Sequence, residues 1–214
     1  MRGLLKNNFF AAWANAKVFA AFLFVLGSFV VVVISQSLLI GFVLTGMIGF
    51  SVNAAAVTKN EFASNWGKYK LTLPVRRVDL IKSLFINLVI WMMIGTFFAL
   101  AGTSLSWLLH GCPFDNPIDM LSMFALGISM SLFTGAVFFP LFYLGGEERS
   151  ESFLVISLLC AFAISFIIIS VVNELMEPGM WHVLIGNAVL AGCSILAYAV
   201  SFPLTVGIFQ RKEY

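Results

Sequence analysis

Six long apolar runs alternate with short polar segments along almost the whole 214-residue chain. None has a Lys, Arg, Asp or Glu in its middle, and each is close to the about 20 residues that a helix needs to cross a bilayer. Backbone polar groups inside lipid must be hydrogen-bonded within their own segment, so each run predicts a transmembrane helix. The runs cover approximately residues 18–34, 38–57, 84–109, 121–144, 153–172 and 183–209.

The composition agrees with a protein that is solvated mainly by lipid. Hydrophobic residues make up 61% of the chain, charged residues only 10%, and the mean hydropathy is +1.01. Soluble domains carry about 25% charged residues, so a water-soluble globule is excluded. The sequence therefore predicts an all-α membrane protein with a single transmembrane domain over residues 1–214.

Residues 1–17 precede the first run and have a different pattern. Leu5, Phe9, Trp13 and Ala16 recur at helical spacing, which is typical of an amphipathic helix on the membrane surface. The apolar piece is too short for the core of a signal peptide, which is about 7–15 residues long. We therefore predict an interfacial helix over 1–17, with a disordered tail as the alternative.

Positive charge is distributed unevenly over the segments between the runs. If the chain crosses the membrane six times, all twelve Lys and Arg residues fall on one side. The other side carries the acidic residues Asp115, Asp119, Glu174 and Glu177. The excess of Lys and Arg in cytoplasmic loops then predicts that both termini are cytoplasmic.

The sequence offers little chemistry for catalysis. It lacks a G-x-x-x-x-G-K-[ST] phosphate loop, and no pattern of metal ligands or catalytic residues is visible. A glutamate pair, Glu147 and Glu148, raises the alternative of an intramembrane protease, but His110 and His182 are predicted on the opposite side. A partnerless channel is a second alternative, although no charged group lies in mid-membrane. We therefore predict that the chain is not an enzyme and binds no metal.

Small residues recur every four positions in three of the runs, a spacing that lets helices approach closely in lipid. These stripes either pack within the chain or face a partner permease or a translocation path. Asn53 and Asn87 are expected to hydrogen-bond between neighbouring helices. The stripes are Gly41, Thr45, Gly49 and Asn53; Gly95, Ala99 and Thr103; and Gly127, Ser131 and Gly135.

The segment 58–83, between the second and third runs, holds six of the twelve cations. Phe62, Trp66 and Tyr69 lie at i, i+4 and i+7, which indicates one face of a helix. A second helix can begin near Pro74 and lead into the third span. The cations alone are explained by topology and by anionic lipid headgroups, each contributing about 1 kcal/mol. The alternative is that the first helix docks onto a cytoplasmic partner.

The residues of this segment resemble those of a known family. The matching positions are Glu61, Trp66, Lys68, Tyr69, Leu73, Pro74, Val75, Arg76, Asp79 and Lys82. They resemble the segment after the second span in small six-span permeases of type-2 ATP-binding-cassette exporters. The nearest subgroup comprises the permeases of the phenol-soluble modulin exporter and related peptide or bacitracin-type exporters.

This resemblance implies a function in a bacterial plasma membrane. Segment 58–83 would contain a coupling helix that docks onto a separate ATPase subunit, which binds ATP and magnesium, while this chain binds no cofactor. A second copy or a paralogue would complete the exporter, and the cargo would be hydrophobic or amphipathic, with peptides favoured and no role for nucleic acid. The docking residues would be Glu61, Phe62, Trp66, Lys68, Tyr69, Pro74 and Arg76.

Overall fold

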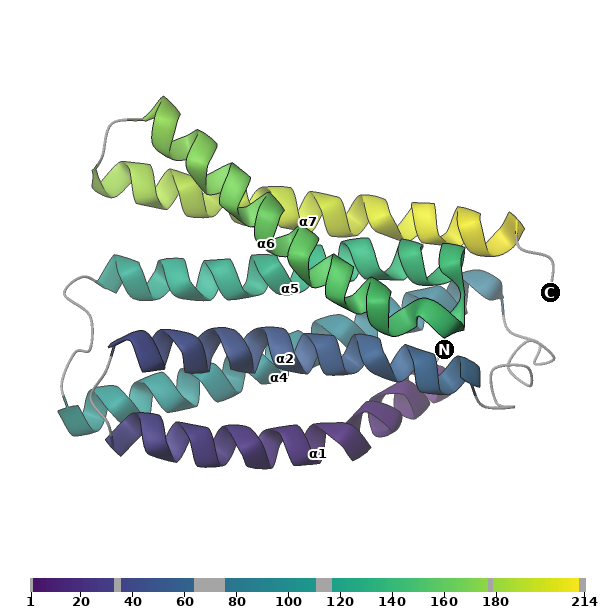
Figure 1. The fold of residues 1–214 in the computed structure, drawn as a ribbon, viewed down its shortest axis with the longest axis horizontal. Coiled ribbons are helices and arrows are strands. Elements are labelled where there is room, and N and C mark those ends of the chain that lie inside the picture. Colours follow the sequence, from purple (N-terminus) through teal and green to yellow (C-terminus); the bar gives the residue numbers. More distant parts are fainter. Residues whose placement is uncertain (1, 33–35, 64–75, 111–116, 177–178, 212–214) are drawn as a thin grey trace.

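The computed structural model describes residues 2–32, 36–63, 76–110, 117–176 and 179–211, which form a bundle of long helices (Figure 1). The helices are α1 (Arg2–Val32), α2 (Gln36–Ala63), α4 (Arg77–His110), α5 (Pro117–Gly145), α6 (Ser150–Leu175) and α7 (Met180–Arg211), with a short 3₁₀-helix η1 (Glu147–Arg149) before α6. All six long helices are long and apolar enough to cross a membrane. The predicted all-α fold with six spans is confirmed.

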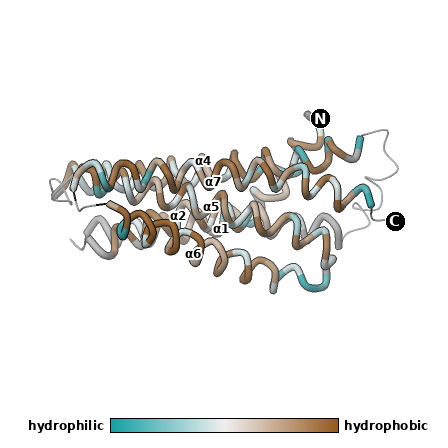
Figure 2. The backbone as a smooth tube through the Cα atoms, turned by 90° about the horizontal axis from the view of Figure 1, so that it is seen from above, coloured by the Kyte–Doolittle hydropathy of each residue, from teal (hydrophilic) through white to brown (hydrophobic). Residues whose placement is uncertain are grey.

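Successive helices run in opposite directions, so the bundle has two distinct ends (Figure 1). We call the cationic end the one where α1, α4 and α6 begin, and the acidic end the one where α2, α5 and α7 begin. Hydrophobic residues occupy most of each helix between these ends (Figure 2). Apart from Lys17, which lies midway along α1, the Lys and Arg residues of the described helices lie at the cationic end. The placement of this end in the cytoplasm stays a prediction.

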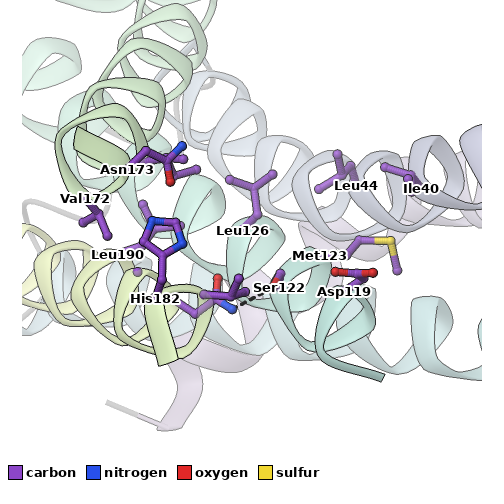
Figure 3. Close-up of a pocket in the computed structure, with 14 residues that line it drawn as sticks. Ile40, Leu44, Asp119, Ser122, Met123, Leu126, Val172, Asn173, His182 and Leu190 are labelled. Atoms are coloured by element: carbon purple, nitrogen blue, oxygen red, sulfur yellow. Dashed lines mark hydrogen bonds between the residues drawn. The ribbon is translucent and has the colours of Figure 1, made fainter. Parts of the chain in front are cut away.

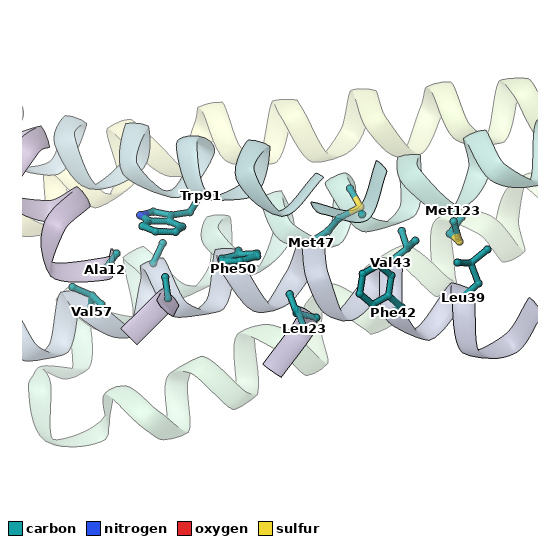
Figure 4. Close-up of a cluster of buried hydrophobic side chains, with 13 residues drawn as sticks. Ala12, Leu23, Leu39, Phe42, Val43, Met47, Phe50, Val57, Trp91 and Met123 are labelled. Carbon is teal, nitrogen blue, oxygen red and sulfur yellow. The ribbon is translucent and has the colours of Figure 1, made fainter. Parts of the chain in front are cut away.

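Helix α5 lies at the centre of the bundle and is the most buried span. It packs against α7, α6 and α2, while α4 packs against α2, and α1 packs against both α2 and α4. The largest buried cluster joins α1, α2 and α4 and includes Met123 of α5, with Phe50 and Trp91 stacked within it (Figure 4). Few residues in the spans of α1, α6 and α7 are buried inside the bundle, as expected where lipid is the solvent.

The first helix differs in detail from its prediction. The described part of α1 continues without interruption from Arg2 into the first span, so the predicted boundary at residue 17 is not visible as a break. Its buried face is formed by Leu4, Asn8, Ala12 and Ala16, and Asn8 Nδ2 donates to Ser83 Oγ of α4 at 3.0 Å. The face predicted for the membrane surface, with Leu5, Phe9 and Trp13, lies one position further along the helix and is half-buried or exposed. Contact with the membrane surface stays a prediction.

Two of the three small-residue stripes pack within the chain. The stripes that begin at Gly95 and at Gly127 are buried, and Ser131 Oγ donates to Met47 O of α2 at 3.3 Å. A Cβ atom on Gly95 would lie only 2.7 Å from the carbonyl oxygen of Gly46, so the backbones of α2 and α4 are in direct contact there. In the stripe on α2, by contrast, Gly41 and Thr45 are exposed.

A proline inside α5 is compensated by a side chain from α7. Pro140 has no N–H group, which leaves the carbonyl of Ala136 without its helical hydrogen bond. Ser201 Oγ of α7 donates to that carbonyl at 2.7 Å, and the bond is buried. The hydroxyl therefore satisfies a backbone group that lipid could not satisfy.

This arrangement predicts a coupling between two substitutions. Ser201→Ala should lower the free energy of unfolding by about 0.6–1.7 kcal/mol, the range for interhelical hydrogen bonds in membranes. In a Pro140→Ala background the helical N–H returns, so the same change should cost much less. Unfolding of the four proteins in mixed micelles by a denaturing detergent gives the double-mutant cycle. Equal costs in both backgrounds would contradict the compensation.

Candidate functional site

Three of the seven predicted docking residues are described by the structure, and they lie at the cationic end of α2 and α4. Glu61 and Phe62 lie in the last turn of α2, and Arg76 is exposed immediately before α4. The backbone N–H of Asp79 donates to the carbonyl of Arg76 at 2.9 Å, which helps to start α4. The other predicted docking residues, Trp66, Lys68, Tyr69 and Pro74, lie outside the described residues.

The helices around this segment extend further than the apolar runs. Helix α2 continues past the predicted end of its span at residue 57 to Ala63, and α4 begins at Arg77, before its span. The described part of the predicted first loop helix is therefore the end of α2. Since α2 and α4 pack against each other, the two helical ends that flank the segment 58–83 are held side by side.

Several buried polar side chains lie on α2 and α4 near their cationic ends. Because the antiparallel helices α2 and α4 touch at Gly46 and Gly95, Thr58 and Ser83 lie at about the same level, 12 residues further towards the cationic end. Asn87 and Trp91 follow Ser83 on one face of α4 at spacings of four residues. Thr58 Oγ1, Asn87 Oδ1 and Trp91 Nε1 are buried without a hydrogen-bond partner among the described residues.

The carbonyl oxygen of the Asn87 side chain therefore accepts no hydrogen bond from Asn53, and this part of the prediction is wrong. Asn53 instead lines an open groove between α1 and α2. The apolar pattern placed both amides near the same end, but it did not show their directions around the helices.

A cavity of about 500 Å³ lies at the acidic end, between α2, α5, α6 and α7 (Figure 3). Most of its wall is apolar. Its polar side chains are Asp119, Ser122, Asn173, His182 and Asn187. The amide of Asn187 donates through Nδ2 to Ser122 Oγ at 2.7 Å, which ties α7 to α5.

His182 lines this cavity from the first turn of α7. Its Nε2 atom is buried and has no hydrogen-bond partner among the described residues. In Figure 3 the imidazole lies beside Asn173, between α6 and α7. Asp119 is exposed and brings a carboxylate to the rim of the same cavity.

Sequence analysis did not predict this cavity. His182 was considered there only as a residue on the side opposite to Glu147 and Glu148. The cavity could have been suspected from the polar residues that recur at the acidic ends of three spans, α5, α6 and α7. Combining these ends requires knowledge of which helices are neighbours, which the apolar pattern does not give.

The structure bears on the protease alternative. Glu148 lies in η1 at the cationic end, and His182 lies at the acidic end, so the glutamate pair and this histidine are separated by the length of the bundle. Nor do the described residues contain a group of three or more His, Cys, Asp or Glu side chains that could hold a metal.

One comparison with known proteins places almost the whole chain in a family. The sequence model of a family described as "ABC-2 family transporter protein" matches residues 3–210. No curated protein and no solved structure matches the chain.

Proposed function

Since the chain belongs to the ABC-2 family of transporter proteins, we propose that it moves hydrophobic or amphipathic molecules, peptides foremost, out of a bacterial cell. The family and the six apolar helices make it a multi-pass membrane subunit of an ATP-binding-cassette transporter. The family match over residues 3–210 is the observation that carries this proposal. The narrower resemblance to phenol-soluble modulin and bacitracin-type exporters, and with it a role in resistance to antimicrobial peptides, is part of the proposal.

Energy comes from a separate ATPase subunit. The chain has no phosphate-binding loop, so ATP and magnesium bind to the partner. We place the contact at the cationic end, where the end of α2 and the start of α4 flank the segment that holds Trp66 and Tyr69. Movement of this segment on ATP binding is transmitted to two helices that pack directly against each other.

A second permease, identical or paralogous, completes the exporter. The exposed Gly41 and Thr45 on α2 provide one face on which a helix can approach closely. The cations at the cationic end contact anionic lipid headgroups, which fixes the orientation with both termini in the cytoplasm.

The proposal is tested by co-expression with an ATP-binding-cassette ATPase encoded beside this chain. Inside-out vesicles that contain both proteins should accumulate a fluorescent amphipathic peptide when ATP is added. The matched control is the same ATPase with its phosphate-binding lysine replaced. Uptake without ATP would favour a channel, cleavage of the peptide would favour a protease, and the absence of a complex with the ATPase would overturn the proposal.

A further inference from the structure

We propose that the cavity at the acidic end is a binding site for a cationic amphiphile, with the apolar part of the ligand inside and its amine at Asp119. The site lies within one permease chain. The inference that exported cargo occupies this site rests on the proposed function. The inference that a cationic amphiphile binds there does not.

The shape and lining of the cavity suit an apolar group. Ligand pockets usually enclose about 300–1,000 Å³ and are mainly apolar with a few polar groups, and this cavity encloses about 500 Å³. Four helices contribute to its wall, so it is a built space between packed spans. Ile40, Leu44, Met123, Leu126, Val172 and Leu190 are among its apolar lining residues.

The polar groups of the cavity include one that calls for a ligand. Ser122 and Asn187 already bond to each other. The buried Nε2 of His182 has no partner among the described residues, and leaving a buried nitrogen unpaired is destabilising. An imidazole nitrogen donates or accepts according to its tautomer, so a hydrogen-bonding group of a ligand can pair with it.

The charge at the rim selects for a cation. Asp119 is the charged residue in the cavity lining, and Glu174 is exposed near the same end of α6. The described helices place no Lys or Arg at the acidic end. A negative rim beside low-dielectric walls concentrates positively charged ligands. An amphiphile with an amine therefore fits better than an anionic one.

Binding is measured on the purified permease alone in nanodiscs of zwitterionic lipid. Rhodamine 6G serves as the fluorescent cationic probe and Nile red as an uncharged one, with empty nanodiscs subtracted. Leu126→Trp fills the cavity. Leu121→Trp is its matched control, since Leu121 is on the same helix and is 53% exposed. Asp119→Asn removes the charge at an exposed position.

We expect Leu126→Trp to weaken rhodamine binding by about tenfold or more, since the apolar part of the probe loses its space. Asp119→Asn should weaken rhodamine binding by roughly 5–10-fold through loss of a charge-assisted contact, with Nile red unaffected. Leu121→Trp should bind like the unchanged protein. Affinities for rhodamine that are the same in all three variants would overturn the site, and equal losses for both probes in Asp119→Asn would overturn the cationic selectivity.

These outcomes are distinct from failure of the proposed function, because no ATPase takes part in the measurement. If rhodamine binds as expected but ATP drives no export, the binding site stands and the cargo assignment falls. If export proceeds and no variant changes binding, the site falls and the exporter stands.

Discussion

Replacing Trp66 with alanine is expected to reduce the amount of ATPase that co-purifies with the permease by at least about tenfold. Trp residues at the centre of protein interfaces often contribute 2 kcal/mol or more, and 1.4 kcal/mol corresponds to a factor of ten. The spacing of Phe62, Trp66 and Tyr69 predicts that their aromatic side chains share one helical face. The measurement is quantitative pull-down with a tag on the permease, together with ATP hydrolysis by the complex.

Two control variants separate docking from general effects. Trp107→Ala removes an indole that is 54% exposed near the acidic end of α4 and should leave assembly unchanged. Lys70→Ala removes a cation from the same segment and should cost at most about 1 kcal/mol, as for exposed ion pairs. If Trp66→Ala assembles normally while Lys70→Ala does not, the contact depends on charge and the aromatic face is not the docking surface.

Among leucine substitutions at the described glycines, Gly95→Leu is expected to be the most destabilising, because its side chain would meet the backbone of another helix. A Cβ atom there meets the backbone of α2, at the carbonyl oxygen of Gly46 and at Met47 Cα, 3.1 Å away. Backbone cannot rotate aside as a side chain does, so α2 and α4 must separate. Overpacking of this kind costs about 1–3 kcal/mol or more. A clear drop in the apparent Tm of the detergent-solubilised protein is the expected readout.

Gly192→Leu is the matched control for that prediction. Gly192 is exposed on α7, and a Cβ atom there meets no atom within 4 Å. The control should unfold at the temperature of the unchanged protein. A similar loss in both variants would show that leucine is unfavourable in this bundle for a reason other than the contact between α2 and α4.

The sequence was sufficient for the number and order of the helices, but not for their ends. Hydropathy reports which residues lipid can solvate, while a helix continues as long as its backbone can be hydrogen-bonded. Residues 58–63 contain polar and charged side chains yet extend α2. The predicted boundary at residue 57 therefore marked the end of the apolar run and not the end of the helix.

The contacts between helices were predictable only in part. The stripes beginning at Gly95 and Gly127 were recognised because small residues at this spacing have few other uses in lipid. On α1, the apolar pattern indicated a face with Phe9 and Trp13 for the membrane surface, but it did not indicate that Ala12 belongs to a face buried against the neighbouring helices. Small residues permit close packing, and large aromatic ones can remain partly exposed to lipid.

The direct contact of Gly46 with Gly95 provides a point about which α2 can tilt as a rigid helix. At a rise of 1.5 Å per residue, the arm from Gly46 to Ala63 is about 25 Å long, and the arm to Gln36 is about 15 Å. Ile40 and Leu44, in the wall of the cavity, lie on the shorter arm. A sideways push on the end of α2 at the cationic end would therefore move the cavity wall in the opposite direction, with about a third of the amplitude at Ile40 and about a tenth at Leu44. Helix α2, moving as one rigid body, would thus link the proposed docking segment to the proposed binding site.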